Sequence, residues 1–128
     1  MTFTLTIHEK PTYLHIIVTG QNRRENVERY LEELLKECRA RNCFRVLLEE
    51  RLEGPRLGTV DVFEIVSNRT EGIPKPLEAV AFVDVNAQGD LMQFAETVAI
   101  NRGFLMKVFN TVSDAEKWLQ NGEPDTNR

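Results

Sequence analysis

The sequence of 128 residues contains little cysteine, glycine or proline, and it has no long apolar run. Its longest apolar runs, such as residues 79–83, have the length of a strand, so we expect no integral membrane segment. A basic start followed by an apolar stretch is also missing, so we expect no signal peptide and a cytoplasmic protein. The composition, 41% apolar and 28% charged, is typical of a globular protein. The length fits one domain over residues 1–120, followed by a polar tail at 121–128.

The two cysteines, Cys38 and Cys43, are expected to stay reduced in such a compartment. Cys38 falls on the apolar side of an expected helix and Cys43 just before a strand, where free cysteine usually packs as a small hydrophobic residue. A redox pair or a metal site is the alternative. Because no second cysteine pair and no histidine cluster complete a zinc-binding set, the sequence predicts no metal site.

Motifs for phosphate-binding loops, dinucleotide-binding turns and serine-hydrolase elbows are missing, so we expect no catalytic residue and no cofactor. His8 and His15 fall in expected strands, where a surface or hydrogen-bonded histidine is the ordinary explanation. The net charge of −4, with arginines interleaved among acids, argues against nucleic acid as a partner. These absences favour a non-enzymatic protein.

Strands and helices are expected to alternate along the chain. Residues 2–8 alternate apolar and polar side chains, as in a half-buried edge strand, and a short turn leads to a second strand at 13–19. The pattern gives four strand–helix units, at 13–42, 44–70, 77–103 and 105–120. We therefore predict an α/β fold in which an antiparallel N-terminal edge strand joins a mostly parallel five-stranded sheet with helices on its faces.

Local signals give the expected boundaries. Asn22 followed by Glu25 resembles a capping box for the first helix, and Ser113 followed by Glu116 does so for the last. The glycines and proline of residues 50–58 predict a loop there, after a strand that ends at Glu49.

Polar residues follow the expected strands, at the sheet edge where α/β proteins commonly bind ligands. Glu49 and Asp84 end what are expected to be neighbouring strands. The pair could bind a hard cation such as magnesium, which prefers oxygen ligands. Alternatively, the two acids cap loops or form ion pairs with Arg51 and Arg56.

The end of the chain carries a resemblance to a known family. The segment LMKVF at residues 105–109, followed by SDAEKWL at 113–119, resembles the SpoIIAA-like family of the STAS superfamily, in its uncharacterised bacterial branch. The resemblance spans residues 2–120 and implies a non-enzymatic protein-interaction or regulatory module in bacterial signalling. It implies that the loop at 50–58 and the helix at 59–69 contact the partner, through Arg51, Arg56, Leu57, Thr59 and Asp61.

Regulatory members of that family carry a serine or threonine at the start of the second helix, where a partner kinase phosphorylates it. Thr59 is the hydroxyl at the matching place and is therefore the candidate phosphoacceptor. Gly58 replaces the acid that precedes the hydroxyl in the family motif, and the following glycine is absent. A phosphate on Thr59 would gain from the free N–H groups of the helix. The alternative is that Thr59 is only a helix N-cap.

A related architecture, the CRAL-TRIO lipid-transfer fold, suggests a second function, a carrier or sensor of a small apolar or lipid-like molecule. The helices at 59–69 and 91–102 would then enclose the ligand, lined by Phe63, Met92 and Phe94. The same side chains could instead fill the core. Self-association is a further expectation, because an edge strand offers a surface for pairing with a second copy.

Overall fold

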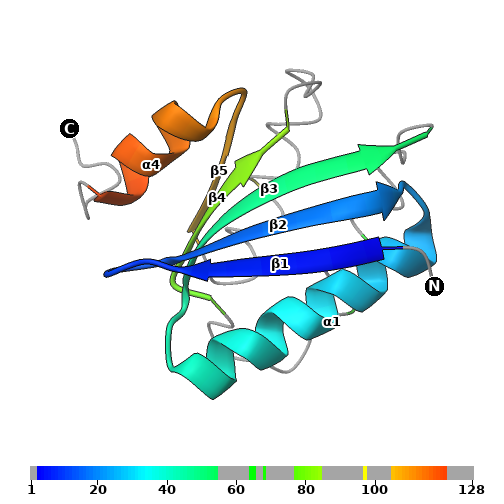
Figure 1. Ribbon diagram of the computed structural model, residues 1–128, viewed down its shortest axis with the longest axis horizontal. Coiled ribbons are helices and arrows are strands. Elements are labelled where there is room, and N and C mark those ends of the chain that lie inside the picture. The colour runs from blue at the N-terminus through cyan, green and yellow to red at the C-terminus, as the bar shows by residue number, and fades with distance from the viewer. Residues whose placement is uncertain are drawn as a thin grey trace.

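In the computed structural model of the chain, residues 3–54, 64–65, 68, 77–84, 97 and 105–120 are described. They form one five-stranded sheet with the strand order β1-β2-β3-β4-β5. The strands are β1 (Phe3–Glu9), β2 (Leu14–Gln21), β3 (Arg45–Glu53), β4 (Ala79–Val83) and β5 (Leu105–Phe109). Two helices, α1 (Arg24–Arg41) and α4 (Val112–Gln120), complete the described elements (Figure 1).

The sheet combines both kinds of strand pairing. β1 and β2 form the expected antiparallel hairpin, since a turn of so few residues can only reverse the chain. The pairs β2–β3, β3–β4 and β4–β5 are parallel. The sheet is therefore mixed, whereas we expected a mostly parallel one. The helices expected at 59–69 and 91–102 fall largely outside the described residues, so the count of four strand–helix units stays a prediction.

The two helices lie on opposite faces of the sheet (Figure 1). Because side chains alternate along a strand, neighbouring residues of β3 contribute to different cores. Val46 and Leu48 pack in the larger cluster with α1, whereas Leu47 packs in the smaller cluster with α4. The buried apolar residues of α1 recur at helical spacing and form one face: Val27, Tyr30, Leu34, Leu35 and Cys38.

Both predicted capping boxes are wrong. The N-cap of α1 is Arg23, which makes no side-chain cap hydrogen bond. Asn26, which is buried, donates instead to the carbonyl of Gln21 and ties the helix to the end of β2. At α4, the backbone N–H of Asp114 donates to the hydroxyl of Thr111 at 3.2 Å, so Thr111 caps that helix. The start of α1 is thus tied to the end of β2, whereas the start of α4 is capped by the threonine directly before it.

β3 is longer than expected. Residues 50–53 belong to the strand, because β2 continues to Gln21 and pairs with Glu53. The exposed residues Arg51 and Glu53 alternate with the partly buried Leu52. Gly54, with a φ of 106°, takes the left-handed region at the end of the strand. Arg51, predicted to lie in a loop, is therefore held on a paired strand.

Candidate functional site

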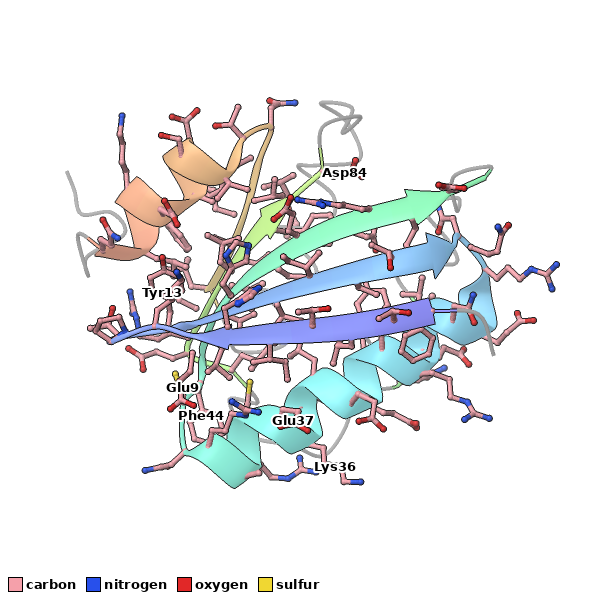
Figure 2. The ribbon with its side chains drawn as sticks, viewed as in Figure 1. Glu9, Tyr13, Lys36, Glu37, Phe44 and Asp84 are labelled. Carbon is pink, nitrogen blue, oxygen red and sulfur yellow. The ribbon has the colours of Figure 1, made fainter. Side chains whose placement is uncertain are left out.

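A pocket of about 540 Å³ opens at the edge of the sheet where the parallel strands end. We call it the carboxyl-edge pocket. Since β2, β3 and β4 run in one direction, their carboxyl ends meet at one edge, as the sequence predicted. Asp84 marks this edge in Figure 2, with Tyr13 and Glu9 at the opposite end. The lining residues are Asn22, Glu49, Glu50, Arg51, Leu52, Val83, Asp84, Asn110, Thr111 and Val112.

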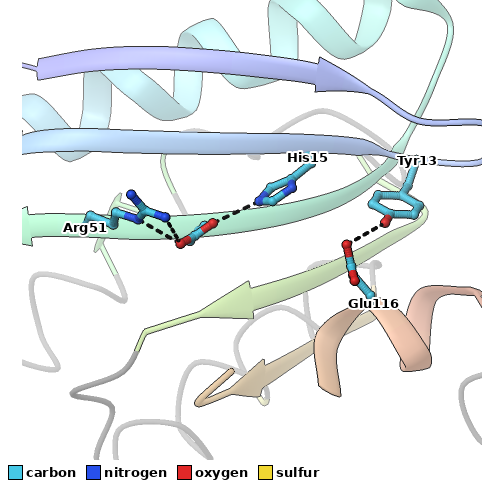
Figure 3. A network of polar contacts seen from close by, with 5 residues as sticks. Tyr13, His15, Arg51 and Glu116 are labelled. Carbon is cyan, nitrogen blue, oxygen red and sulfur yellow. Dashed lines mark hydrogen bonds and ion pairs between the residues drawn. The ribbon is translucent and has the colours of Figure 1, made fainter. Parts of the chain in front are cut away.

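Glu49 lines the pocket and also contacts His15 and Arg51, whose side chains are labelled in Figure 3. Its carboxylate lies 3.0 Å from the Nε2 atom of His15. The other carboxylate oxygen accepts from the guanidinium of Arg51, at 2.7 Å from Nε and 2.5 Å from Nη2. The side chains of His15 and Glu49 are only 13% and 12% exposed, whereas that of Arg51 is 58% exposed. Arg51 is thus an exposed cation anchored on a buried anion.

The protonation of Glu49 follows from these contacts. Burial alone would raise the pKa of this carboxyl, because it penalises the charged form. The hydrogen bonds from His15 and Arg51, with the positive charge of Arg51, outweigh burial and leave the pKa below its ordinary value. Glu49 is therefore ionised at neutral pH, and Nε2 of His15 is the donor in their hydrogen bond.

A second polar contact lies on the α1 face of the same edge. The hydroxyl of Tyr30, a fully buried α1 residue, donates a short hydrogen bond to Glu50. Burial raises the pKa of Tyr30 well above its ordinary value, and the nearby carboxylates of Glu50 and Asp84 raise it further. Tyr30 therefore acts as a permanent hydrogen-bond donor that fixes one wall of the pocket.

Glu49 and Asp84 line the same pocket but do not act as a pair. Glu49 aligns with Val83 in the β3–β4 register, so Asp84 lies one residue farther on and projects to the other face. Its negative charge acts on Tyr30, on the α1 side. Glu49 instead forms the ion pair with Arg51, one of the two roles left open above. Within the described part of the chain, no group of three or more His, Cys, Asp or Glu residues is placed to hold a metal ion.

Of the residues that the sequence nominated for a partner surface, Arg51 is described and lies in the pocket. Arg56, Leu57, Thr59 and Asp61 lie outside the described residues, as do the candidate ligand-lining residues Phe63, Met92 and Phe94. The phosphoacceptor and the apolar carrier therefore stay predictions. Both cysteines are free: Cys38 is buried, as expected, and Cys43 is half-buried.

Sequence reasoning missed three contributors to this site. It took His15 for an ordinary sheet histidine, and it assigned no role to Glu50 or to the hydroxyl of Tyr30. The register shows why: His15 aligns with Leu47, so Glu49 is its diagonal neighbour on the same face. Only the alternation of side chains, applied after the strands are paired, could have brought His15 and Glu49 together.

Comparisons with known proteins support one conclusion about the architecture. No protein-family model matches the sequence, and no curated protein matches it. Among solved structures, the chain is similar to an uncharacterised protein of the DUF3478 family from Shewanella loihica PV-4, described as having a SpoIIAA-like fold. The match covers 92% of this chain and 93% of the other, at 21% identity and a TM-score of 0.50. The present chain has a SpoIIAA-like fold.

The SpoIIAA-like fold agrees with the resemblance carried by the closing segment of the sequence. The aromatic rings of Phe109 and Trp118, which belong to that segment, pack with their centroids 5.8 Å apart. Leu119 beside them is buried. The closing segment is thus a packing motif that attaches α4 to β5. In the part of the chain that the structure describes, no helix is long and apolar enough to cross a membrane.

Proposed function

We propose that this chain is a non-enzymatic protein-interaction module of STAS type that binds a partner protein at the carboxyl-edge pocket. The observation that carries the proposal is the guanidinium of Arg51, exposed at the pocket but oriented by the buried carboxylate of Glu49. Arginine held in this way loses little conformational freedom on binding, and it is enriched at the centres of protein interfaces. Arg51 retains further N–H donors for a partner's carbonyl or carboxylate oxygens.

Two titratable groups at this edge of the sheet, Glu49 in the pocket and Tyr30 behind Glu50, support a binding role over acid–base catalysis. A general acid or base works best with a pKa near the operating pH. The pKa of Glu49 lies below its ordinary value and that of Tyr30 well above its own, so both are shifted away from neutrality. Each of these groups is also engaged in a hydrogen bond that positions another side chain. They act as supports for a binding surface.

Within this proposal, the resemblance assigns the rest of the surface to Arg56, Leu57, Thr59 and Asp61. Thr59 would be the switch, because a phosphate there would add up to about two negative charges to the contact region. These four residues come three to eight positions after the end of β3 in the sequence, and β3 carries Arg51 at the pocket. The proposed regulatory role therefore rests on the family resemblance.

Photo-crosslinking in cells tests the proposal. A photoreactive phenylalanine analogue would replace Asn110, an exposed pocket residue, and a matched control would carry it at Thr12, an exposed residue of the β1–β2 turn. We expect one defined protein to crosslink at Asn110 and not at Thr12, and the crosslink to be lost on Arg51→Ala. No discrete crosslink at Asn110, or one that persists unchanged in the Arg51→Ala variant, would overturn the proposal.

A further inference from the structure

The two edges of the sheet differ in how they are protected against pairing. β5 forms one edge; it is five residues long, carries the exposed Lys107 at its centre, and contacts α4. Short length, a central lysine and a covering helix are the devices by which proteins block edge-to-edge association. β1 forms the other edge; it has seven residues and contains no lysine, proline or glycine.

The backbone of β1 has a regular set of groups that point away from the sheet. The N–H of Lys10 donates to the carbonyl of Tyr13 at 2.9 Å, which makes these two residues a hydrogen-bonded pair at the hairpin turn. Hydrogen-bonded pairs alternate along an antiparallel ladder, so the even residues of β1 bond to β2. The N–H and C=O groups that point away from β2, to an edge that no other described strand pairs with, belong to the odd residues: Phe3, Leu5, Ile7 and Glu9.

The side chains of the same odd residues are incompletely buried. Phe3, Leu5 and Ile7 pack against the α1 core but remain only partly covered. An added strand beyond β1 would cover them further and would bond the open backbone groups at the same time. β1 alternates apolar and polar residues and carries no acid or lysine before Glu9. A strand added beside β1 would match it by alternating apolar and uncharged polar residues in the same way.

We propose that the occupant is a second copy of this chain, paired antiparallel through β1 about a twofold axis at Thr6. A twofold axis normal to the sheet keeps each side chain on its own face, and so it pairs odd residues with odd ones and even with even. With the axis at Thr6, Leu5 lies opposite Ile7 of the second copy, and Thr4 lies opposite its His8. All seven residues of each β1 then have a partner.

This register satisfies the open backbone groups of both strands. The four outward-facing residues of each copy form mutual pairs, giving about eight backbone hydrogen bonds across the interface. Moving the axis to Leu5 or Ile7 leaves two residues at one end of each strand unpaired. The two Glu9 carboxylates lie at opposite ends of the paired strands, and each copy already holds its Glu9 with Arg41 at 3.1 Å. Like charges therefore do not oppose the pairing.

Sedimentation and hydrogen exchange test the inference on the full chain. Because a pair of seven-residue strands is small beside a typical stable interface, we expect a concentration-dependent equilibrium between a 14.8 kDa monomer and its dimer. Amide protons of Leu5 and Ile7 should gain protection as the dimer forms, whereas those of Thr4 and Thr6 should be protected at every concentration. A monomer at all concentrations, or a dimer with unprotected Leu5 and Ile7 amides, would refute the pairing.

A charge placed on the axis gives a second, independent test. Thr6→Lys sets two ammonium groups directly opposite each other in the dimer while its exposed side chain leaves the monomer core intact. We expect the dissociation constant of the dimer to rise about fivefold or more, with no change for the control Thr12→Lys. Equal dimerisation of Thr6→Lys and the unmodified chain would show that the interface lies elsewhere.

A pair of opposite charges introduced across the interface tests the Thr6-centred register. In the Thr6-centred pairing, residues 4 and 8 of different copies are opposite, whereas within one strand they are four residues apart and do not meet. Thr4→Lys combined with His8→Glu should therefore bind more tightly than either single variant. Failure of the double variant to exceed both single variants would exclude this register.

Discussion

Replacing Glu49 by glutamine should destabilise the fold by an amount that the contacts of this residue allow us to work out. The carboxylate, 12% exposed, accepts from His15 on one oxygen and from Arg51 on the other. Glutamine keeps the shape but replaces one oxygen by an N–H donor. Either His15 or Arg51 then faces a donor, and the negative charge between them is lost.

The magnitude follows from the exposure of the partners. A buried charge-assisted hydrogen bond contributes about 1.5–3 kcal/mol. The share that involves Arg51 is discounted, because its side chain is 58% exposed and solvent-screened pairs contribute about 0–1 kcal/mol. We expect Glu49→Gln to lower the free energy of unfolding by about 1–2 kcal/mol at neutral pH. Urea unfolding followed by the fluorescence of Trp118, the single tryptophan, measures it.

The destabilisation caused by Glu49→Gln should also depend on pH, and it should become smaller in acid. The pKa of Glu49 is lower in the folded protein than its ordinary value of 4.5, so the folded state binds the proton less readily than the unfolded chain does. The stabilisation that ionised Glu49 gives the fold is complete above the pKa of this residue in the unfolded chain. It disappears as the pH falls through the pKa of Glu49 in the folded protein. The difference between the unmodified chain and Glu49→Gln should therefore be constant near neutrality and narrow below about pH 4.5.

The matched control is Glu37→Gln, which alters an ion pair with Arg41 on the exposed side of α1. Its partner is 34% exposed and Glu37 is 32% exposed, so we expect a loss below about 0.5 kcal/mol. If Glu49→Gln cost no more than Glu37→Gln, or if its cost did not narrow in acid, Glu49 would not be the buried anchor described above.

Two further predictions concern the hydrogen bond of Tyr30 and the reactivity of the two cysteines. Tyr30→Phe removes the donor to Glu50 and should cost about 1–3 kcal/mol, with a smaller additional loss in a variant that also carries Glu50→Gln; strict additivity would show that the two do not interact. Burial raises the pKa of Cys38 to about 12, so a thiol reagent at neutral pH should label the half-buried Cys43 first and Cys38 only after unfolding; equal native rates would contradict this.

The periodicity of the sequence was sufficient to predict the strands and the first long helix, because apolar periodicity reflects burial that the fold reproduces. It failed at residues 50–53, which the glycines and proline that follow them assigned to a loop. Pairing with β2 overrides the low strand propensity of the charged residues, and the side chains of Arg51 and Glu53 remain exposed. Leu52 carried the missing signal, since it lies on the same face of β3 as Leu48 and packs against the same α1 core.

The sequence was sufficient to predict where the candidate site lies, but not which of its side chains contact one another. Parallel strands bring their carboxyl ends to one edge, and this rule located Glu49, Asp84 and Arg51 together. It could not distinguish a carboxylate pair from an ion pair, because that depends on which face each side chain takes. The β3–β4 register decides the matter by placing Asp84 one residue beyond the level of Glu49.

The two proposals have a joint geometric consequence. A twofold axis normal to the sheet reverses the direction of the strands in the second copy. The carboxyl-edge pockets of two paired copies would therefore open at opposite strand ends of one ten-stranded sheet. The two β3 strands would be separated by five strand spacings, about 24 Å across the sheet. A short partner segment cannot reach both pockets, so each copy should bind its own partner without avidity. Crosslinking at Asn110 should therefore persist in Thr6→Lys, and dimerisation should persist in Arg51→Ala, which separates the failure of one proposal from the failure of the other.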